Sequence, residues 1–223
     1  MRPKVLKLTA GVLLFFGILP VVNAQNAEPI NVVTTAVPFL RISPDARAGG
    51  MGDIGIATSP DAGGGFWNIG KVAFNESKGG IAATYTPWLK NLVNDVYLAS
   101  LSGYYKIDET SALNASLRYF SLGNIQFTDQ NGTLNGNGKP REFGFDIGYS
   151  RKLSDKLGLG VALRYINSDL ANGAASGGNT YKAGNSVAGD VGFYYNGLND
   201  NGDGFAFGAT LTNLGAKISY TGI

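Results

Sequence analysis

Two short runs in this sequence contain residue types that bind ligands in other proteins. The first satisfies the GxGxxG pattern, in which glycines let the backbone approach a pyrophosphate, and reads Gly50-Met51-Gly52-Asp53-Ile54-Gly55. No apolar strand precedes it and no βαβ pattern follows, so we expect these glycines to permit tight packing or positive φ angles instead. The second run, Asp200-Asn201-Gly202-Asp203-Gly204, offers oxygen ligands for calcium but lacks the distal glutamate of a calcium loop. We expect it to form a hairpin turn.

The composition gives little support for catalysis. The chain has neither histidine nor cysteine, which excludes Ser-His-Asp and Cys-His nucleophiles, imidazole or thiolate metal sites and a disulfide framework. Paired carboxylates are not excluded by counting, but nothing in the pattern places two of them in a cleft. We therefore predict no enzyme activity, no cofactor and no metal site.

The N-terminus has the features of an export signal. Arg2, Lys4 and Lys7 precede an apolar run over 12–19, and small residues end at Ala24. This is the pattern of a secretory signal peptide over 1–24. Three of the 18 basic residues precede the cleavage point and all 16 acidic residues follow it, so the mature chain has a net charge of −1. A nucleic-acid partner is unsupported.

From about residue 80 onward, seven segments alternate between large apolar residues and small or polar ones, as strands with two different faces do. Each is close to the roughly 9 to 11 residues of a tilted membrane strand. The second alternates least clearly. The segments are Ile81–Trp88, Val96–Ile107, Ala112–Leu122, Glu142–Arg151, Gly158–Ser168, Val187–Gly197 and Phe205–Leu214.

The two faces of these segments suit different surroundings. In the run FGFDIGYSR, which begins at Phe143, large apolar side chains alternate with glycine, aspartate and serine. Such a row suits a wall with lipid outside and water inside. On the inward face, charged residues of alternating sign fall near the middle of four successive strands. We predict a charge ladder of Arg118, Asp146, Arg164 and Asp190, either as a network that keeps buried charges paired or as a surface that contacts a substrate.

The connections predict the orientation of the strands. Short connections at 108–111, 152–157 and 198–204 alternate with long polar ones at 123–141 and 169–186. Outer-membrane barrels have short periplasmic turns and long external loops. We therefore expect Asn124 and Asn179 outside the cell, and Asp155 and Asp200 in the periplasm. A soluble all-β barrel is the alternative.

The predicted fold class is therefore all-β, a transmembrane antiparallel β-barrel in the outer membrane of a Gram-negative bacterium. An odd number of strands leaves two unpaired edges, so we interpret 80–223 as the N-terminal half of a barrel of about 14 strands. The segment 25–79 lacks a strand period and is rich in glycine and proline. We expect it to form an irregular hatch or plug with a short helix.

The run from Leu40 to Thr58, with Trp67-Asn68 after it, resembles the start of the PorV (LptO) family, outer-membrane proteins of the type IX secretion system within the wider FadL-like barrel family. Relatives continue with proline and alanine after this Trp-Asn pair, whereas this chain has Ile69-Gly70. The residues that carry the resemblance to the family's hatch motif are Pro44, Asp45, Ala46, Arg47, Gly49, Gly50, Met51, Gly52, Asp53, Trp67 and Asn68.

The resemblance implies a receptor and shuttle rather than an enzyme. Members of the family bind secreted cargo proteins by a C-terminal β-sandwich domain at the giant outer-membrane translocon. They deliver it to an attachment complex with a PorU-like sortase. The long external loops are then the candidate cargo-binding surface, because binding sites are often on loops of a rigid scaffold. The candidate residues are Phe127, Asp129, Asn131, Lys139, Arg141, Asn172, Asn179 and Tyr181.

Two other functions stay open at this point. A FadL-like transporter of hydrophobic small molecules has the same barrel and hatch, but it needs an apolar conduit, and the inward residues are mostly small, hydroxylated or charged. An assembly protein of the same machine, similar to PorQ or PorP, binds no cargo. The hatch motif favours the shuttle.

Overall fold

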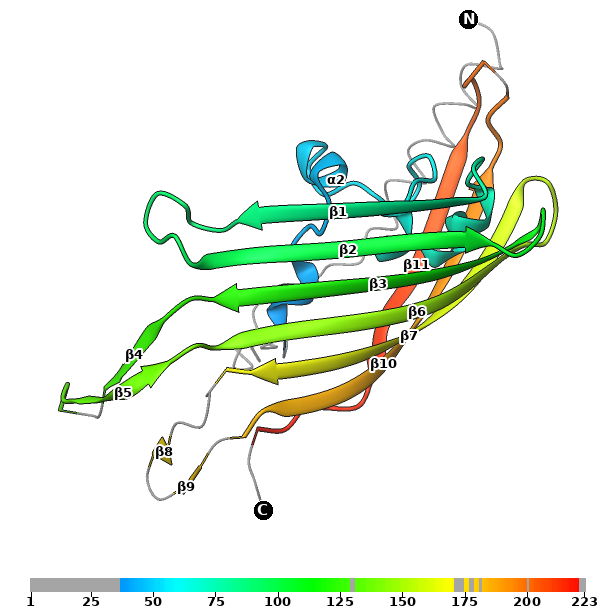
Figure 1. The fold of residues 1–223 in the computed structure, drawn as a ribbon. Coiled ribbons are helices and arrows are strands. Elements are labelled where there is room, and N and C mark those ends of the chain that lie inside the picture. The colour runs from blue at the N-terminus through cyan, green and yellow to red at the C-terminus, as the bar shows by residue number, and fades with distance from the viewer. Residues whose placement is uncertain are drawn as a thin grey trace, which may run out of the picture. The chain divides into compact units, whose positions relative to one another are not determined.

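Seven antiparallel strands form the main sheet (Figure 1). In this computed structural model, residues 37–128, 131–170, 175–176, 179–180, 182–199 and 201–220 are described, and every statement below concerns them. The expected signal peptide and residues 25–36 of the expected hatch lie outside these ranges. The strands are β1 (Gly79–Pro87), β2 (Val96–Lys106), β3 (Ser111–Leu122), β6 (Arg141–Lys152), β7 (Leu157–Asp169), β10 (Gly184–Asn196) and β11 (Ala206–Gly215).

Each main-sheet strand pairs with the next one along the chain, in the order β1-β2-β3-β6-β7-β10-β11. The seven predicted strands are confirmed, with ends that differ by at most three residues. The long connections hold more structure than the sequence predicted. Two short hairpins lie in them: β4 (Ile125–Thr128) with β5 (Leu134–Gly138), and β8 (Ala175–Ser176) with β9 (Asn179–Thr180).

The connections define two ends of the sheet. Residues 88–95, 123–140 and 170–183 join strands at one end, which we call the long-loop end. Residues 107–110, 153–156 and 197–205 join them at the other, the short-turn end. The long connections at 123–140 and 170–183 alternate with the short ones as predicted, whereas 88–95, which the sequence analysis did not classify, is about as short as 197–205.

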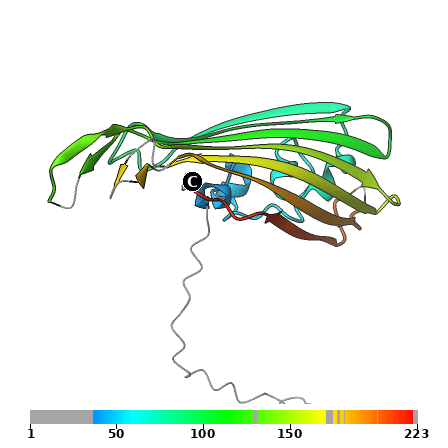
Figure 2. The same ribbon diagram turned by 90° about the horizontal axis from the view of Figure 1, so that it is seen from below.

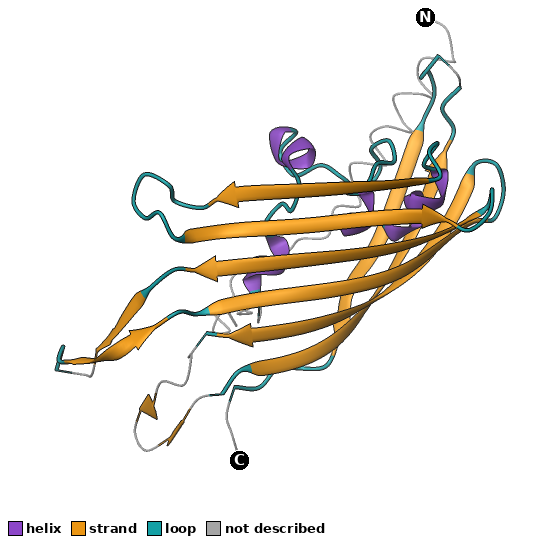
Figure 3. Ribbon diagram, viewed as in Figure 1, coloured by secondary structure: helices purple, strands orange, loops and turns teal. Residues whose placement is uncertain are grey.

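The segment 37–78 lies against one face of the sheet, and we call it the covering segment. Figure 3 shows that the helices of the structure are confined to it, and Figure 2 shows them on one side of the strands. Among the described residues, no helix has the length and apolar character to cross a membrane. The helices are 3₁₀ helix η1 (Pro38–Arg41), α-helix α2 (Ala46–Gly50) and 3₁₀ helices η2 (Gly64–Phe66) and η3 (Ile69–Phe74).

The covering segment divides the sheet into a covered face and a bare face. Burial alternates along β3, β6 and β7, with inward residues buried and outward ones exposed. The outward side chains include Ile147 and Leu163, which are 55% and 69% exposed. The structure also shows which residues of β2 face outward: Leu98 and Ser102 are buried on the covered face, while Leu101 is exposed on the bare face.

Three layers follow one another along the strands of the covered face. At the long-loop end, Phe39 of η1 packs with Leu98, Phe120, Ile166 and Ala188. At the short-turn end, Ile69, Val72 and Ala73 of η3 pack with Ala112. The charged side chains of the expected ladder lie between these two apolar clusters. Burial of apolar side chains is the main force that holds the covering segment on the sheet.

Candidate functional site

The four ladder residues meet at the centre of the covered face. Asp146 lies opposite Arg164 in the pairing of β6 with β7, and Arg164 Nε donates a hydrogen bond to its carboxylate. Arg164 Nη2 donates to Asp190 Oδ2 at 2.8 Å, and Arg118 Nη2 lies 3.8 Å from Asp146 Oδ2. These side chains are at most 10% exposed. Two cations and two anions therefore form one buried network without net charge.

The network also holds the covering segment and an edge strand. Arg118 Nη1 donates to the carbonyl oxygen of Leu40 at 3.1 Å, and its guanidinium lies 5.3 Å from the centre of the Phe66 ring. Arg164 Nη1 donates to the side-chain oxygen Oδ1 of Asn213, and the backbone N–H of Asn213 donates to Asp190 Oδ1 at 2.7 Å. Asn213 has a φ of 60°, next to an irregularity in the pairing of β10 with β11. A β-bulge redirects side chains in this way.

The hatch-motif residues organise the covering segment itself. Asp45 Oδ1 accepts a hydrogen bond from the Ala48 amide at 2.7 Å and caps α2, while Oδ2 accepts from Trp67 Nε1 at 2.5 Å. Arg47 donates to Asp61 Oδ2 and to Ser59 Oγ, both at 2.6 Å. Ala46, Gly49 and Gly50 complete the short helix. The motif thus ties the α2 turn to the chain that follows it.

The glycines of the GxGxxG run have structural roles here. Gly52 has a φ of 77°, which side chains with a Cβ rarely adopt. Gly55 lies against the indole of Trp67, where a Cβ has no room. Asp53 also has a positive φ, of 61°, and Met51 is 40% exposed. A positive φ at Gly52 and tight packing at Gly55 are as expected from the sequence, whereas Gly50 ends α2 with neither feature.

Asn68 joins the covering segment to strand β10, next to the edge strand β11 of the sheet. Its Oδ1 accepts from the Gly70 amide at 2.9 Å and caps η3. Its Nδ2 donates to the carbonyl oxygens of Ile56 at 3.0 Å and Phe193 at 2.8 Å. A single side chain therefore holds a loop, a helix and strand β10 together, and it is 1% exposed.

Helix η3 lies in a cradle of glycines that three strands provide. A Cβ added to Gly160 would lie 2.7 Å from the carbonyl carbon of Ile69, and one added to Gly158 would lie 2.5 Å from the carbonyl oxygen of Gly70. The cradle allows the η3 backbone to lie directly on the sheet backbone. Its members are Gly148 of β6, Gly158 and Gly160 of β7 and Gly192 of β10, while Gly208 of β11 lies against Ile56 and the side chain of Asn68.

Lys71 is a buried cation within the covering segment that the sequence analysis missed. Its ammonium group donates to the Gly55 carbonyl oxygen at 2.6 Å and to Thr58 Oγ1 at 3.1 Å. Gly64 leaves room for its Cε. Burial lowers the pKa of Lys71 from 10.5 to about 8, although the negative charge of Asp61 acts in the opposite direction.

This shift predicts a pH dependence of stability. Between pH 8 and 10.5 the unfolded Lys71 keeps its proton and the folded one releases it. The unfolded state then binds more protons, so the free energy of unfolding rises with pH across this window, and below the window Lys71 contributes no pH dependence. We expect a rise on the order of 3 kcal/mol that is absent from Lys71→Met. Denaturant titrations of both proteins at several pH values measure it, and equal pH profiles would contradict the shift.

The described candidate residues of the long connections lie in or beside the short hairpins at the long-loop end. Phe127 is in β4, Asn131 is in the turn between β4 and β5, Lys139 follows β5 and Arg141 begins β6. Asn131, Lys139 and Arg141 are exposed. Asn179 belongs to β9, while Asp129, Asn172 and Tyr181 lie outside the described residues.

The run from Asn201 to Gly204 lies in the connection between β10 and β11, as predicted for a turn. Gly202 and Gly204 have φ angles of 82° and 134°. Asn199 Oδ1 accepts from the amides of Asn201 at 3.1 Å and Asp203 at 2.8 Å. The structure groups no three acidic side chains as a metal site among the residues it describes, and Asp200 lies outside these.

Comparisons with known proteins identify the family of this chain. A search of curated proteins found no significant match. A family model described as "Type IX secretion system protein PorV" matches residues 24–223, which includes the hatch motif, the covering segment and all seven main-sheet strands. That description is of secretion and not of catalysis. The chain therefore belongs to the PorV family of type IX secretion system proteins.

Proposed function

We propose that the main sheet is part of the wall of an outer-membrane β-barrel, with its bare face toward lipid. The support is the apolar character of that face, on which large side chains are exposed from the first strand to the last. Ile81 of β1, Val161 of β7 and Leu211 of β11 are 81%, 55% and 58% exposed. Exposed apolar areas of this extent are rare on soluble monomers. A soluble all-β barrel turns such rows inward.

Aromatic residues on the bare face support the same placement. Tyr85, Tyr97 and Tyr119 form a chain of ring contacts near the long-loop end, with centroids 5.1 and 6.2 Å apart. Rings with a polar tip suit the boundary between lipid and water. The long-loop end then faces the outside and the short-turn end the periplasm. In a barrel of about 14 strands, the edge strands β1 and β11 pair with further strands, so that their main-chain N–H and C=O groups form hydrogen bonds.

Within this barrel, we propose that the protein captures exported cargo by its C-terminal domain at the translocon and carries it to the attachment complex with a PorU-like sortase. Family membership carries this proposal. The β4–β5 hairpin adds a physical reason, since it extends from the long-loop end (Figure 1) and presents an exposed Leu134 at 65%. The covering segment, held by the glycine cradle and the ion network, serves as a hatch that closes the pore.

Removal of the β4–β5 hairpin tests cargo capture. We expect that replacing residues 125–138 with a short turn lowers the amount of cargo that co-purifies from outer membrane by at least about tenfold, while membrane insertion is unchanged, because loops contribute little to the packed scaffold. Mass spectrometry of the purified complexes measures this. A matched control alters the connection 197–205 at the opposite end, which we expect to leave cargo recovery intact.

The same purification distinguishes the other functions. Normal cargo recovery with the shortened hairpin would exclude this hairpin as the binding surface. Bound fatty acid inside the barrel, without a protein partner, would indicate the hydrophobic-substrate transporter. Translocon components without cargo would indicate a purely structural member of the machine. The polar covered face, with Ser102, Asn114 and Ser116 buried beside the ion network, argues against an apolar conduit.

A further inference from the structure

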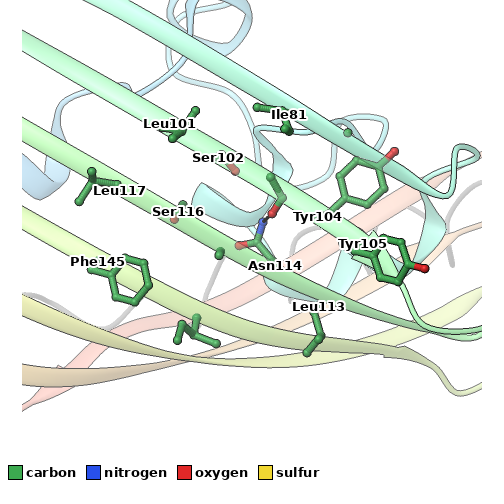
Figure 4. A pocket seen from close by; sticks show the side chains of 14 residues that line it. Ile81, Leu101, Ser102, Tyr104, Tyr105, Leu113, Asn114, Ser116, Leu117 and Phe145 are labelled. Atoms are coloured by element: carbon green, nitrogen blue, oxygen red, sulfur yellow. Dashed lines mark hydrogen bonds between the residues drawn. The ribbon is translucent and has the colours of Figure 1, made fainter.

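The bare face contains a hollow that no side chain of the described residues fills. It has a volume of 560 Å³ and lies over strands β1, β2, β3 and β6. Figure 4 shows Ile81, Leu101, Leu117 and Phe145 around it, with Tyr105 and Leu113 on its short-turn side. It lies on the opposite side of the sheet from the ion network and the covering segment.

The cross-strand register explains why the hollow exists. Gly103 of β2 pairs with Ala115 of β3, and these two small residues form the floor. Their outer neighbours in the same row are Ile81, which pairs with Gly103, and Ile147, which pairs with Ala115. The adjacent row toward the long-loop end has Leu101 opposite Leu117. Large side chains therefore surround two small ones on a flat sheet, and a pit results.

The position and length of the hollow fit within one leaflet of a bilayer. It extends along β2 from Tyr105 to Leu101, which is about 13 Å at the usual rise of a strand, or about 10 Å along the membrane normal for a strand tilted by about 40°. Half of the hydrocarbon core of a bilayer is about 15 Å. Since the hollow begins beside the short-turn end, it lies within the half of the core that belongs to the periplasmic leaflet under the proposed orientation.

A cation lies where the headgroup of such a lipid would be. Lys78 precedes β1, is exposed, and its Nζ lies 5.7 Å from the centre of the Tyr105 ring. The neighbouring Lys106 is already paired with Glu109 at 3.8 Å. An ammonium group above a tyrosine ring is complementary to a phosphate, and the ring leads from it into the apolar hollow.

We propose that this hollow binds one acyl chain of a phospholipid from the periplasmic leaflet, with the lipid phosphate at Lys78. The inference rests on the proposed function, because it requires the bare face to lie in the outer membrane. A phospholipid held here fills the pit that Gly103 and Ala115 leave and seals this part of the wall. It is distinct from any cargo bound at the long-loop end.

Three variants test this lipid site. Ala115→Leu fills the floor with a side chain that points away from the covered face. Ala209→Leu is the matched control, since Ala209 is an exposed alanine on the bare face of β11, outside the hollow. Lys78→Gln removes the charge and leaves the hollow. Each protein is purified from outer membrane in mild detergent, and its retained phospholipid is identified and counted by native mass spectrometry.

We expect the wild type and Ala209→Leu to retain one phospholipid, and Ala115→Leu to retain at least about tenfold less, because displacement of only two buried methylenes has that effect on affinity. Lys78→Gln should retain less phospholipid than the wild type but more than Ala115→Leu, because the lipid phosphate loses its cation while the hollow still holds the acyl chain. Equal retention by Ala115→Leu would overturn the site while cargo recovery still supports the shuttle. A wild type absent from the membrane fraction would overturn both proposals. A photoreactive residue at Leu117 that labels a protein in place of lipid would also overturn the site.

Discussion

Replacement of Asp146 by alanine is expected to lower the free energy of unfolding by about 3 to 5 kcal/mol. Asp146 accepts hydrogen bonds from Arg164 and from Ser116 Oγ, the latter at 3.0 Å, and it is the anion nearest to Arg118. Without it, two buried guanidinium groups share Asp190 as their remaining anionic partner in the network. Urea unfolding of the refolded protein in detergent micelles measures the loss.

Two companion variants show whether the effect belongs to the network. Asp190→Ala should give a smaller loss, because Asp190 pairs with Arg164 alone and is the most exposed of the four side chains, at 10%. Simultaneous Arg118→Met, Asp146→Leu, Arg164→Met and Asp190→Leu should recover part of the stability, because replacing all four charges of the network together leaves none unpaired. A loss below about 1 kcal/mol for Asp146→Ala would place these charges in a solvated environment instead.

Substitution of Gly160 by alanine is expected to displace the covering segment from the sheet. The new methyl group meets backbone atoms of Ile69 and Gly70, at 2.7 to 2.9 Å, and backbone cannot rotate away as a side chain can. Overpacking of this kind lowers stability by about 1 to 3 kcal/mol. Limited proteolysis should cut within 37–78 faster than in the wild type, and mass spectrometry of the fragments locates the cuts.

Gly144 provides the control on the same covered face. A Cβ there lies 3.5 Å from Leu40 Cδ2 and 3.7 Å from Phe39 Cζ, which is ordinary van der Waals contact. Gly144→Ala should therefore leave both the proteolysis rate and the stability near those of the wild type. Equal protection of Gly144→Ala and Gly160→Ala would show that η3 does not depend on the cradle.

The strands were predictable because their alternation is a local property of the sequence. One face of β6 can be identified from Phe145, Ile147 and Tyr149 alone, without information on the neighbouring strands. The mid-strand charges were also visible, since similar strand lengths bring Arg118, Asp146 and Arg164 to similar heights. The sequence thus predicted the sheet and the place where the charges meet.

The docking of the covering segment was not predictable in the same way. Gly160 and Gly192 looked like small inward residues, and only the strand pairing shows that η3 rests on them. Asn213 contacts the network through a local irregularity in pairing that leaves no periodic signal. Lys71 has no neighbouring acidic residue in the sequence to mark it as buried. The β4–β5 hairpin lies in a run of polar and glycine residues that also suits an irregular loop.

The glycine cradle has a consequence for the order of folding. The covering segment precedes every strand of the main sheet, yet the cradle requires β6, β7 and β10 to be paired. The hydrogen bond from Asn68 to Phe193 closes 125 residues, and contacts this distant in sequence form late and slowly. We therefore expect the covering segment to dock only after these strands have paired, so that its docking is a late step of folding.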